Sequence, residues 1–307
     1  MINTIKQALN KMQHTVSNSC WMVLGALTPP FASKLAPTRI GQLLLLLLLS
    51  GCQSPMTQLE QLSSQNAHQV SIQPTRPFPL ATSVPSVKPT SARLRIYLEG
   101  DGHAWATPSQ PSLDPSPRTL LMARLAVTDP QPSLYLARPC QFVSAPACNP
   151  QVWTDQRFGQ TALDSLDQAL TQIRRQYGNR DFELIGYSGG AALALLLAAQ
   201  RNDIAVVQTL AGNLSPRQWA QSLDLTPLRG SLEPLDRAER LRHVAQRHFI
   251  GYEDRTVPPI LYQHYRRSLG PADCVEVVRL PGVDHADGWI EAWAQWRHKP
   301  LNCTPQW

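Results

Sequence analysis

The stretch from Asp181 to Arg201 constrains the fold of this chain most strongly. A short apolar run, Phe182 to Ile185, leads into Gly-Tyr-Ser-Gly-Gly at residues 186–190, and nine consecutive Ala and Leu residues follow. A serine with glycine at both second neighbours, set between a buried strand and a buried helix, is the pattern of a nucleophile elbow. Glycine is needed there because the turn is strained and its neighbours pass close to the strand and the helix. The pattern predicts that Ser188 is a nucleophile; the alternative is a glycine-rich connection with an incidental serine.

Apolar segments of strand and helix length alternate from residue 94 to the C-terminus. Such alternation favours an α/β fold, with a mainly parallel central sheet and helices on both faces. Two proline-flanked runs, residues 69–72 and 78–81, are expected at the edge of the sheet. Strands are expected at residues 94–98, 134–137, 182–185, 204–211, 248–250 and 275–278, and helices at 118–126, 161–177, 191–199 and 289–298.

The N-terminal region has the features of an export signal. Seven leucines, Leu43 to Leu49, follow Lys34 and Arg39. This run is too short to cross a bilayer as a helix, which needs about 20 apolar residues, but it suits the apolar part of a signal peptide. Leu49-Ser50-Gly51-Cys52 resembles a bacterial lipobox, in which the chain is cut before a cysteine that then receives lipid. The alternative is an ordinary secretory signal with an incidental cysteine.

The lipobox predicts the organisation of the whole chain. Residues 1–51 are expected to be a lipoprotein signal peptide. Residues 52–68, rich in Ser and Gln, are expected to form a flexible tether from lipidated Cys52. Residues 69–307 would then be the folded domain, with a possible small lid at 215–247. The expected location is the outer membrane, facing the periplasm.

Charge and cysteine content limit the possible partners. Residues 1–51 contain four basic and no acidic residues, so the chain from residue 52 onward carries about +2 of the total charge of +6. This small excess does not favour a nucleic-acid partner. No spacing of Cys and His suggests a metal site. Four cysteines allow three disulfide pairings, and the two shortest loops favour Cys140–Cys148 and Cys274–Cys303.

Two loops offer partners for Ser188. A nucleophilic serine needs a base, and the base needs a carboxylate that fixes its tautomer. In an open α/β sheet these groups follow the carboxyl ends of strands. The loop after residues 248–250 contains Asp254, and the loop after residues 275–278 contains His285. We predict Asp254 as the acid and His285 as the base; the rival acids are Glu253, Asp284 and Asp287.

The elbow and these two loops give the chain a resemblance to the α/β-hydrolase superfamily. The shared features are Gly186–Gly190, the G-x-x-D-x-x-V-P setting of Asp254, and the His285 loop, in the order Ser, acid, His. The resemblance covers roughly residues 69–300. It implies the α/β-hydrolase fold and cleavage of an acyl substrate through an acyl-enzyme, without a cofactor.

The resemblance also implies an oxyanion hole. The N–H of Gly189 would be the first donor, and the second would come from the loop after Leu98, at Asp101 or Gly102. The family commonly has His-Gly at the start of this loop, where this chain has Glu99-Gly100.

The expected function is that of a serine esterase acting on a small-molecule or lipid acyl substrate. A peptidase, thioesterase or acyltransferase would use the same triad, because a fold does not determine its chemistry. A catalytically silent, lipid-anchored binding protein is the alternative from another class. Four aromatic residues are candidates for an apolar acyl pocket, with core packing as the alternative: Trp105, Trp153, Tyr187 and Trp219.

Overall fold

The structure is a computed structural model that describes residues 53–303. The predicted signal peptide, residues 1–51, and the predicted lipidation site, Cys52, lie outside these residues. Between residues 53 and 303, no helix has the length and apolar character that crossing a membrane requires.

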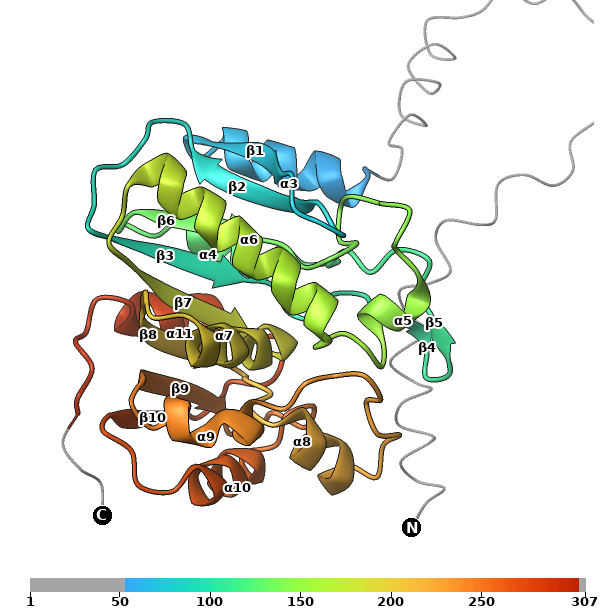
Figure 1. Ribbon diagram of the computed structural model, residues 1–307, viewed down its shortest axis with the longest axis vertical. Coiled ribbons are helices and arrows are strands. Elements are labelled where there is room, and N and C mark those ends of the chain that lie inside the picture. The colour runs from blue at the N-terminus through green and yellow to red at the C-terminus, as the bar shows by residue number, and fades with distance from the viewer. Residues whose placement is uncertain (1–52, 304–307) are drawn as a thin grey trace, which may run out of the picture. The chain divides into compact units, whose positions relative to one another are not determined.

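One eight-stranded sheet forms the centre of the domain (Figure 1). Its strands lie in the order β1-β2-β6-β3-β7-β8-β9-β10. Neighbours from β6 to β10 run parallel, whereas β2 is antiparallel to both β1 and β6. The prediction of a mainly parallel sheet is therefore confirmed. The strands are β1 (His68–Gln73), β2 (Leu80–Pro85), β3 (Arg93–Leu98), β6 (Ser133–Leu136), β7 (Asp181–Tyr187), β8 (Ile204–Leu210), β9 (Ala245–Gly251) and β10 (Val275–Leu280).

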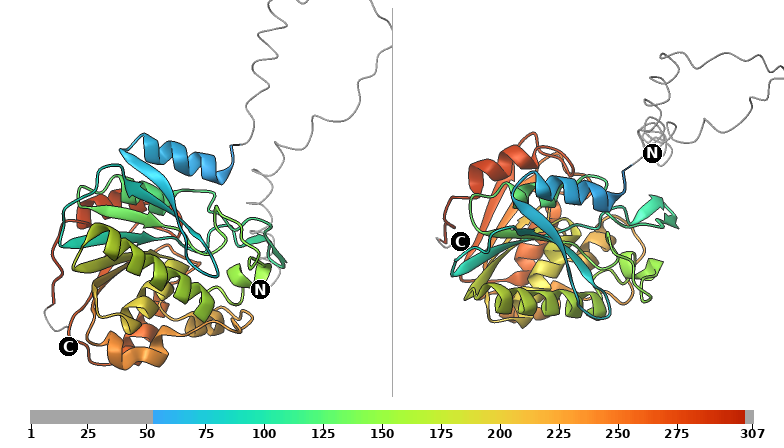
Figure 2. Two further views of the ribbon diagram at one scale, coloured as in Figure 1. Left: turned by 45° about the horizontal axis from the view of Figure 1, so that its top comes forward. Right: turned by 90° about the horizontal axis from the view of Figure 1, so that it is seen from above.

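Helices cover both faces of this sheet, as predicted (Figure 2). Successive strand residues point to opposite faces, so Ile96 and Tyr97 of β3 belong to different cores. The core around Tyr97 contains α3 (Pro55–Ser64), α4 (Leu121–Val127) and α11 (Trp289–Trp296). The core around Ile96 contains α6 (Gln160–Tyr177), α7 (Gly189–Gln200), α9 (Ala238–Leu241) and α10 (Ile260–Leu269).

The remaining elements lie in the connections between these strands and helices. The short ribbon of β4 and β5 follows β3, and α5 precedes α6 (Figure 1). Helices α8 and η1 come between β8 and α9. Their bounds are β4 (Trp105–Thr107), β5 (Gln110–Pro111), α5 (Pro150–Trp153), α8 (Pro216–Ser222) and η1 (Pro234–Arg237).

Local sequence signals explain the ends of several helices. Helix α6 ends at Tyr177 because Gly178 adopts a left-handed conformation, with φ of 74°, that favours glycine. Its first residue is Gln160 and its N-cap is Gly159, so the helix begins one residue before the predicted start at residue 161. In α11, Trp289 and Trp293 are each 1% exposed and pack in the core that also contains Tyr97.

The prediction of a flexible tether over residues 52–68 is wrong for most of this stretch. Residues 55–64 form α3, which begins where the Ser54 hydroxyl accepts the N–H of Thr57 and Pro55 occupies the first turn. Leu59 is fully buried, and the Ser63 hydroxyl bonds Ser83 of β2. The high Ser and Gln content hid an amphipathic helix that belongs to the domain.

The predicted lid, residues 215–247, does not form one separate element. It contains α8, η1, α9 and the first residues of β9. Arg247 in β9 is fully buried and pairs with Glu276 of β10 at 2.7 Å. The lid prediction is therefore wrong for residues 245–247, which belong to the central sheet.

Both predicted disulfides are present. Cys140 is joined to Cys148, and Cys274 to Cys303. The first closes the loop that follows β6, beside the carboxyl edge of the sheet. The second ties the chain after α11 to the residue that precedes β10.

Candidate active site

Ser188 lies at a strained turn between β7 and α7. Its φ of 50° and ψ of −120° lie outside the regions that most residues adopt. A Cβ on Gly186 would lie 2.6 Å from the carbonyl oxygen of Gly190, and a Cβ on Gly190 would lie 2.5 Å from that of Glu99. Both glycines are therefore required by close approaches of the backbone around the serine. This is the local geometry that the Gly-Tyr-Ser-Gly-Gly motif predicts.

The structure brings Ser188, His285 and Asp254 together. His285 Nε2 lies 3.0 Å from Ser188 Oγ, and His285 Nδ1 lies 2.9 Å from Asp254 Oδ2. The three side chains come from the loops that follow β7, β9 and β10, which end at the same edge of the sheet. With Nδ1–H donated to the carboxylate, the free lone pair of Nε2 faces the serine hydroxyl, which is the arrangement of a base beside a nucleophile.

Asp254 is held in place by its own loop. The side chain is 1% exposed, and Oδ1 accepts the N–H groups of Thr256 and Val257, each at 2.8 Å. These bonds leave Oδ2 directed at His285. No ion pair between Asp254 and Arg255, the alternative role for this carboxylate, is found in residues 53–303.

The rival acids do not reach the histidine ring. Glu253 and Asp287 are exposed. Asp284 Oδ1 instead accepts the backbone N–H groups of Ala286 and Asp287, both at 2.8 Å, and so shapes the turn that carries His285.

Tyr187 and Trp289 fix the backbone of His285. The Tyr187 hydroxyl donates to the His285 carbonyl oxygen at 2.6 Å, and Trp289 Nε1 donates to the same oxygen at 3.1 Å. The Tyr187 ring also lies 5.4 Å from the imidazole, measured between centroids. Tyr187, the residue before the nucleophile, therefore also holds the backbone and ring of the base.

The loop after β3 lies against the start of α7. Gly189 is the first residue of α7, where an N–H has no partner inside the helix. A Cβ on Gly189 would lie 1.9 Å from Asp101 Oδ1, so the Asp101 side chain covers this glycine. Gly102 has a φ of 62°, and a Cβ on it would lie 2.2 Å from the Pro115 carbonyl oxygen. The loop that contains the predicted oxyanion donors, Asp101 and Gly102, is thus adjacent to Gly189.

Gln141 supports this loop from the segment after β6. Its Nε2 donates to the Gly100 carbonyl oxygen at 3.1 Å, and its Oε1 accepts the N–H of Arg138 at 3.0 Å. Cys140, the neighbouring residue, is held by the disulfide to Cys148.

Asp101 forms ion pairs with two buried arginines. Arg138 Nη1 bonds Asp101 Oδ1, and Arg157 Nε lies 3.2 Å from Asp101 Oδ2. Burial alone would raise the pKa of the Asp101 carboxyl, but the charges of Arg157 and Arg138 outweigh burial and hold this pKa below its usual value. Asp101 is therefore ionised at neutral pH. Sequence reasoning missed both arginines, although a charged residue directly after the strand at 134–137 was a signal for Arg138.

Glu99 is a buried carboxyl behind the same loop. It is 2% exposed and accepts the Gly100 N–H and the Tyr135 hydroxyl, both at 2.9 Å. Burial raises its pKa from 4.5 to about 7, and the two hydrogen bonds and Arg138 offset only part of this rise.

We expect Glu99→Gln to change how stability depends on pH. Between the unfolded pKa and the folded pKa of Glu99 the folded state holds a proton that the unfolded state has lost, so the stability of the native protein falls as pH rises from about 4.5 to 7. Glutamine cannot ionise and keeps an acceptor oxygen. Relative to the native protein, the variant should therefore gain about 3 kcal/mol in unfolding free energy between pH 4 and pH 8. Urea unfolding at both pH values measures the gain, and equal pH dependence in the two proteins would contradict it.

The predicted aromatic residues separate into two groups. Trp219 Nε1 donates to the Thr256 carbonyl oxygen at 2.7 Å and so lies against the loop of Asp254, and Tyr187 contacts His285. Trp153 is buried in the core, and Trp105 is 42% exposed on β4.

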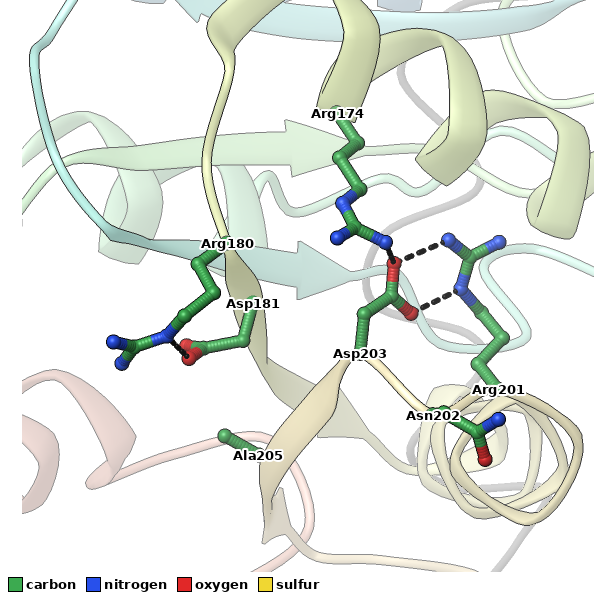
Figure 3. Close-up of a pocket in the computed structure, with 7 residues that line it drawn as sticks. All are labelled: Arg174, Arg180, Asp181, Arg201, Asn202, Asp203 and Ala205. Carbon is green, nitrogen blue, oxygen red and sulfur yellow. Dashed lines mark hydrogen bonds and ion pairs between the residues drawn. The ribbon is translucent and has the colours of Figure 1, made fainter.

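A depression of about 620 Å³ lies at the opposite edge of the sheet from Ser188 (Figure 3). It is found where β7 and β8 begin, whereas Ser188 follows the end of β7. Asp203 in this depression is held by Arg174 at 3.1 Å and by Arg201 at 2.7 Å. Its charged groups are mutually paired and none of the triad residues lines it. In residues 53–303 no cluster of His, Cys, Asp and Glu could hold a metal ion.

Comparisons with known proteins identify the fold. No family model and no curated protein matches the sequence. An esterase of Pyrococcus furiosus superposes with a TM-score of 0.55 at 13% identity, over 81% of this chain and 92% of that one. The chain has the α/β-hydrolase fold. Est1E of Butyrivibrio proteoclasticus gives 0.54 at 14% identity over 74% of this chain and 94% of its own. A cold-adapted esterase from an Arctic intertidal metagenomic library gives 0.52 at 16%, over 75% and 89%.

Proposed function

We propose that this α/β-hydrolase-fold protein is a serine hydrolase that cleaves acyl esters. One observation carries the proposal: Ser188 Oγ, at a strained elbow, is 3.0 Å from His285 Nε2, whose Nδ1 is 2.9 Å from the buried Asp254 carboxylate. Three residues far apart in sequence, each on a separate loop, form a chain of hydrogen bonds that ends at a serine hydroxyl. If these three residues served only to stabilise the fold, neither the Ser–His–Asp hydrogen-bond order nor the strained backbone of Ser188 would be needed.

In the proposed reaction the Ser188 oxygen attacks the ester carbonyl carbon while His285 Nε2 takes the hydroxyl proton. The carbonyl oxygen becomes an oxyanion, which the N–H of Gly189 and an N–H of the Asp101–Gly102 loop stabilise. His285 then donates its proton to the alkoxide leaving group as the ester C–O bond breaks. Water repeats the cycle on the acyl-enzyme, with His285 as base, and releases the acid and free Ser188.

The ester class is favoured over other acyl substrates by the solved structures with this fold. Three of them are described as esterases, with TM-scores of 0.55, 0.54 and 0.52. The substrate would be a small-molecule or lipid ester bound beside Ser188 at the carboxyl edge of the sheet. A peptidase, thioesterase or acyltransferase would use the same three residues.

A fluorophosphonate probe tests this proposal directly, because it phosphonylates only an activated serine. We expect stoichiometric labelling of the native protein, located at Ser188 by peptide mass, and no labelling of Ser188→Ala. Cleavage of 4-nitrophenyl esters of increasing chain length then separates esterase activity from bare nucleophilicity. A native protein that resists the probe would favour the silent binding protein, and labelling at another serine would contradict the site.

We also propose that lipid on Cys52 holds the domain at the outer membrane, facing the periplasm. The support is Leu49-Ser50-Gly51-Cys52 after seven leucines, and the absence of aspartate at residues 53 and 54. Several acyl chains anchor a protein stably where one chain is marginal. The same probe provides the test in cells: the labelled band should sediment with outer membranes, and Cys52→Ala should move it to the soluble fraction. A native band that is soluble would contradict the anchor.

A further inference from the structure

Arg157 is a buried cation with no role in the triad. Its side chain is 4% exposed and packs against two aromatic rings. The guanidinium carbon is 5.4 Å from the centroid of the Phe158 ring and 5.3 Å from that of Trp219. Aromatic faces attract a guanidinium but provide no hydrogen-bond acceptor in its plane. The rings therefore fix the orientation of Arg157 and leave its planar edges available.

The hydrogen-bonding capacity of this guanidinium is largely unused. Arg157 Nε forms no hydrogen bond within residues 53–303, and its 3.2 Å contact with Asp101 Oδ2 is an ion pair only. Among the hydrogen bonds of these residues none involves either Nη atom, and neither Nη is among the buried atoms without a partner, so both Nη atoms reach solvent. Arg138, by comparison, donates to Asp101 and, at 2.7 Å through Nη2, to the Arg157 carbonyl oxygen. Leaving Nε buried without a hydrogen-bond acceptor is costly, which requires an explanation.

Arg157 also lies between two loops that surround Ser188. On one side it contacts Asp101, whose carboxylate covers Gly189, the residue after the nucleophile. On the other side it contacts Trp219, whose Nε1 donates to Thr256 in the loop of Asp254. The cation is therefore separated from Gly189 by one carboxylate group and from the acid loop by one indole ring.

The charges in this cluster do not cancel. Asp101 supplies one negative charge to the two positive charges of Arg138 and Arg157. Both guanidinium groups are almost fully buried, where solvent screens charge weakly. Glu99 also interacts with Arg138 and is partly ionised at neutral pH, so the excess charge beside the nucleophile is positive but smaller than +1. Arginine binds a carboxylate through two parallel N–H···O bonds, and the two Nη atoms of Arg157 provide such a pair of donors.

We propose that Arg157 binds a free carboxylate of the substrate, so that the substrate is an ester carrying a second, ionised acid group. The proposal rests on the proposed function, because it assigns the substrate class of that same site. The carboxylate could be on the acyl side, as in a monoester of a dicarboxylic acid, or on the alcohol side. Both sources would use the same two donors of Arg157.

The test compares matched charged and neutral esters on the full chain. The acyl-side pair is the 4-nitrophenyl monoester of glutaric acid and its methyl diester. The alcohol-side pair is the butyrate ester of 4-hydroxybenzoic acid and its methyl ester. In the native protein, kcat/KM should favour the charged member of one pair by about 10- to 100-fold, as expected for a hydrogen-bonded charge pair. The pair that shows the preference identifies the side.

The decisive quantity is the charged-to-neutral ratio in variants. Arg157→Gln should lower it by about 10- to 100-fold. Arg175→Gln, an exposed change of equal charge on α6, should leave it unchanged. Because the ratio compares two substrates on the same protein sample, partial loss of folded protein does not affect it. A native ratio near one in both pairs, or an unchanged ratio in Arg157→Gln, would overturn the proposal.

A binding measurement keeps the two proposals distinguishable. If the native protein hydrolyses the neutral esters without preferring the charged ones, the carboxylate site is wrong and the proposed function stands. If it hydrolyses neither, the proposed function fails. Calorimetric titration with monomethyl glutarate then tests Arg157 separately: binding by the native protein that is lost in Arg157→Gln supports the site, and no binding overturns it.

Discussion

Replacing His285 by alanine is expected to lower kcat for an ester by about 10⁶. The imidazole takes the Ser188 proton during attack and returns it to the leaving group, so its loss leaves an alcohol that is scarcely ionised at neutral pH. Alanine also removes the partner of Ser188 Oγ at 3.0 Å. The residual rate would come from binding and from the oxyanion donors. Steady-state hydrolysis of a 4-nitrophenyl ester, normalised to the concentration of folded protein, measures the loss.

His298→Ala is the matched control for this prediction. His298 follows α11, is exposed, and comes from the same end of the chain. Its replacement should change kcat by less than threefold. A His285→Ala variant that keeps more than one tenth of native kcat would show that another group is the base.

The site depends on local patterns that sequence can reveal and on side-chain contacts that it cannot. Ser188 could be singled out because its turn admits only glycine at two flanking positions, where a Cβ would lie within 2.6 Å of a carbonyl oxygen. Asp254 and His285 could be singled out because each follows an apolar strand, and parallel strands end at one edge. Such signals depend on the backbone, and the backbone is what residue patterns predict.

Arg157 and the Asp101 side chain carry no comparable signal. Arg157 lies in an irregular stretch between α5 and α6, and its partners Asp101 and Trp219 are distant in sequence. Their contacts exist only because the loops after β3 and β8 meet at the carboxyl edge. The prediction of an N–H donor at Asp101 considered the backbone alone and therefore missed its carboxylate.

Helix α3 shows the opposite error, in which composition outweighed a local signal. Ser54 followed by Pro55 is a helix start, and Met56, Leu59 and Leu62 recur at a spacing of three residues. These apolar residues pack against the core that also contains α4 and α11. This stretch was expected to be a tether because its average Ser and Gln content was considered rather than the positions of its apolar residues.

Replacing Asp254 by asparagine is expected to lower kcat by about 10⁴. The amide keeps the size of the side chain, but it turns an N–H donor toward either His285 or the backbone. If the amide oxygen stays with the N–H groups of Thr256 and Val257, the amide nitrogen faces His285 Nδ1 and forces the ring into the tautomer that places a proton on Nε2. Nε2 then cannot accept the Ser188 proton. The loss should therefore lie in kcat, with KM changed little.

Asp284→Asn is the control that distinguishes Asp254 from the nearest rival carboxylate. Asp284 directly precedes His285 in sequence, whereas Asp254 lies 31 residues before it, but the Oδ1 of Asp284 caps the turn at Ala286 and Asp287. Asparagine retains an acceptor oxygen for that turn, so activity should fall by less than tenfold. A pH profile of kcat adds a second criterion: Asp254→Asn should recover activity at high pH, where hydroxide assists attack, and Asp284→Asn should follow the native profile. The reverse pattern would make Asp284 the acid. The carboxylate that sets the tautomer of His285 is the one whose replacement should change the pH dependence of kcat.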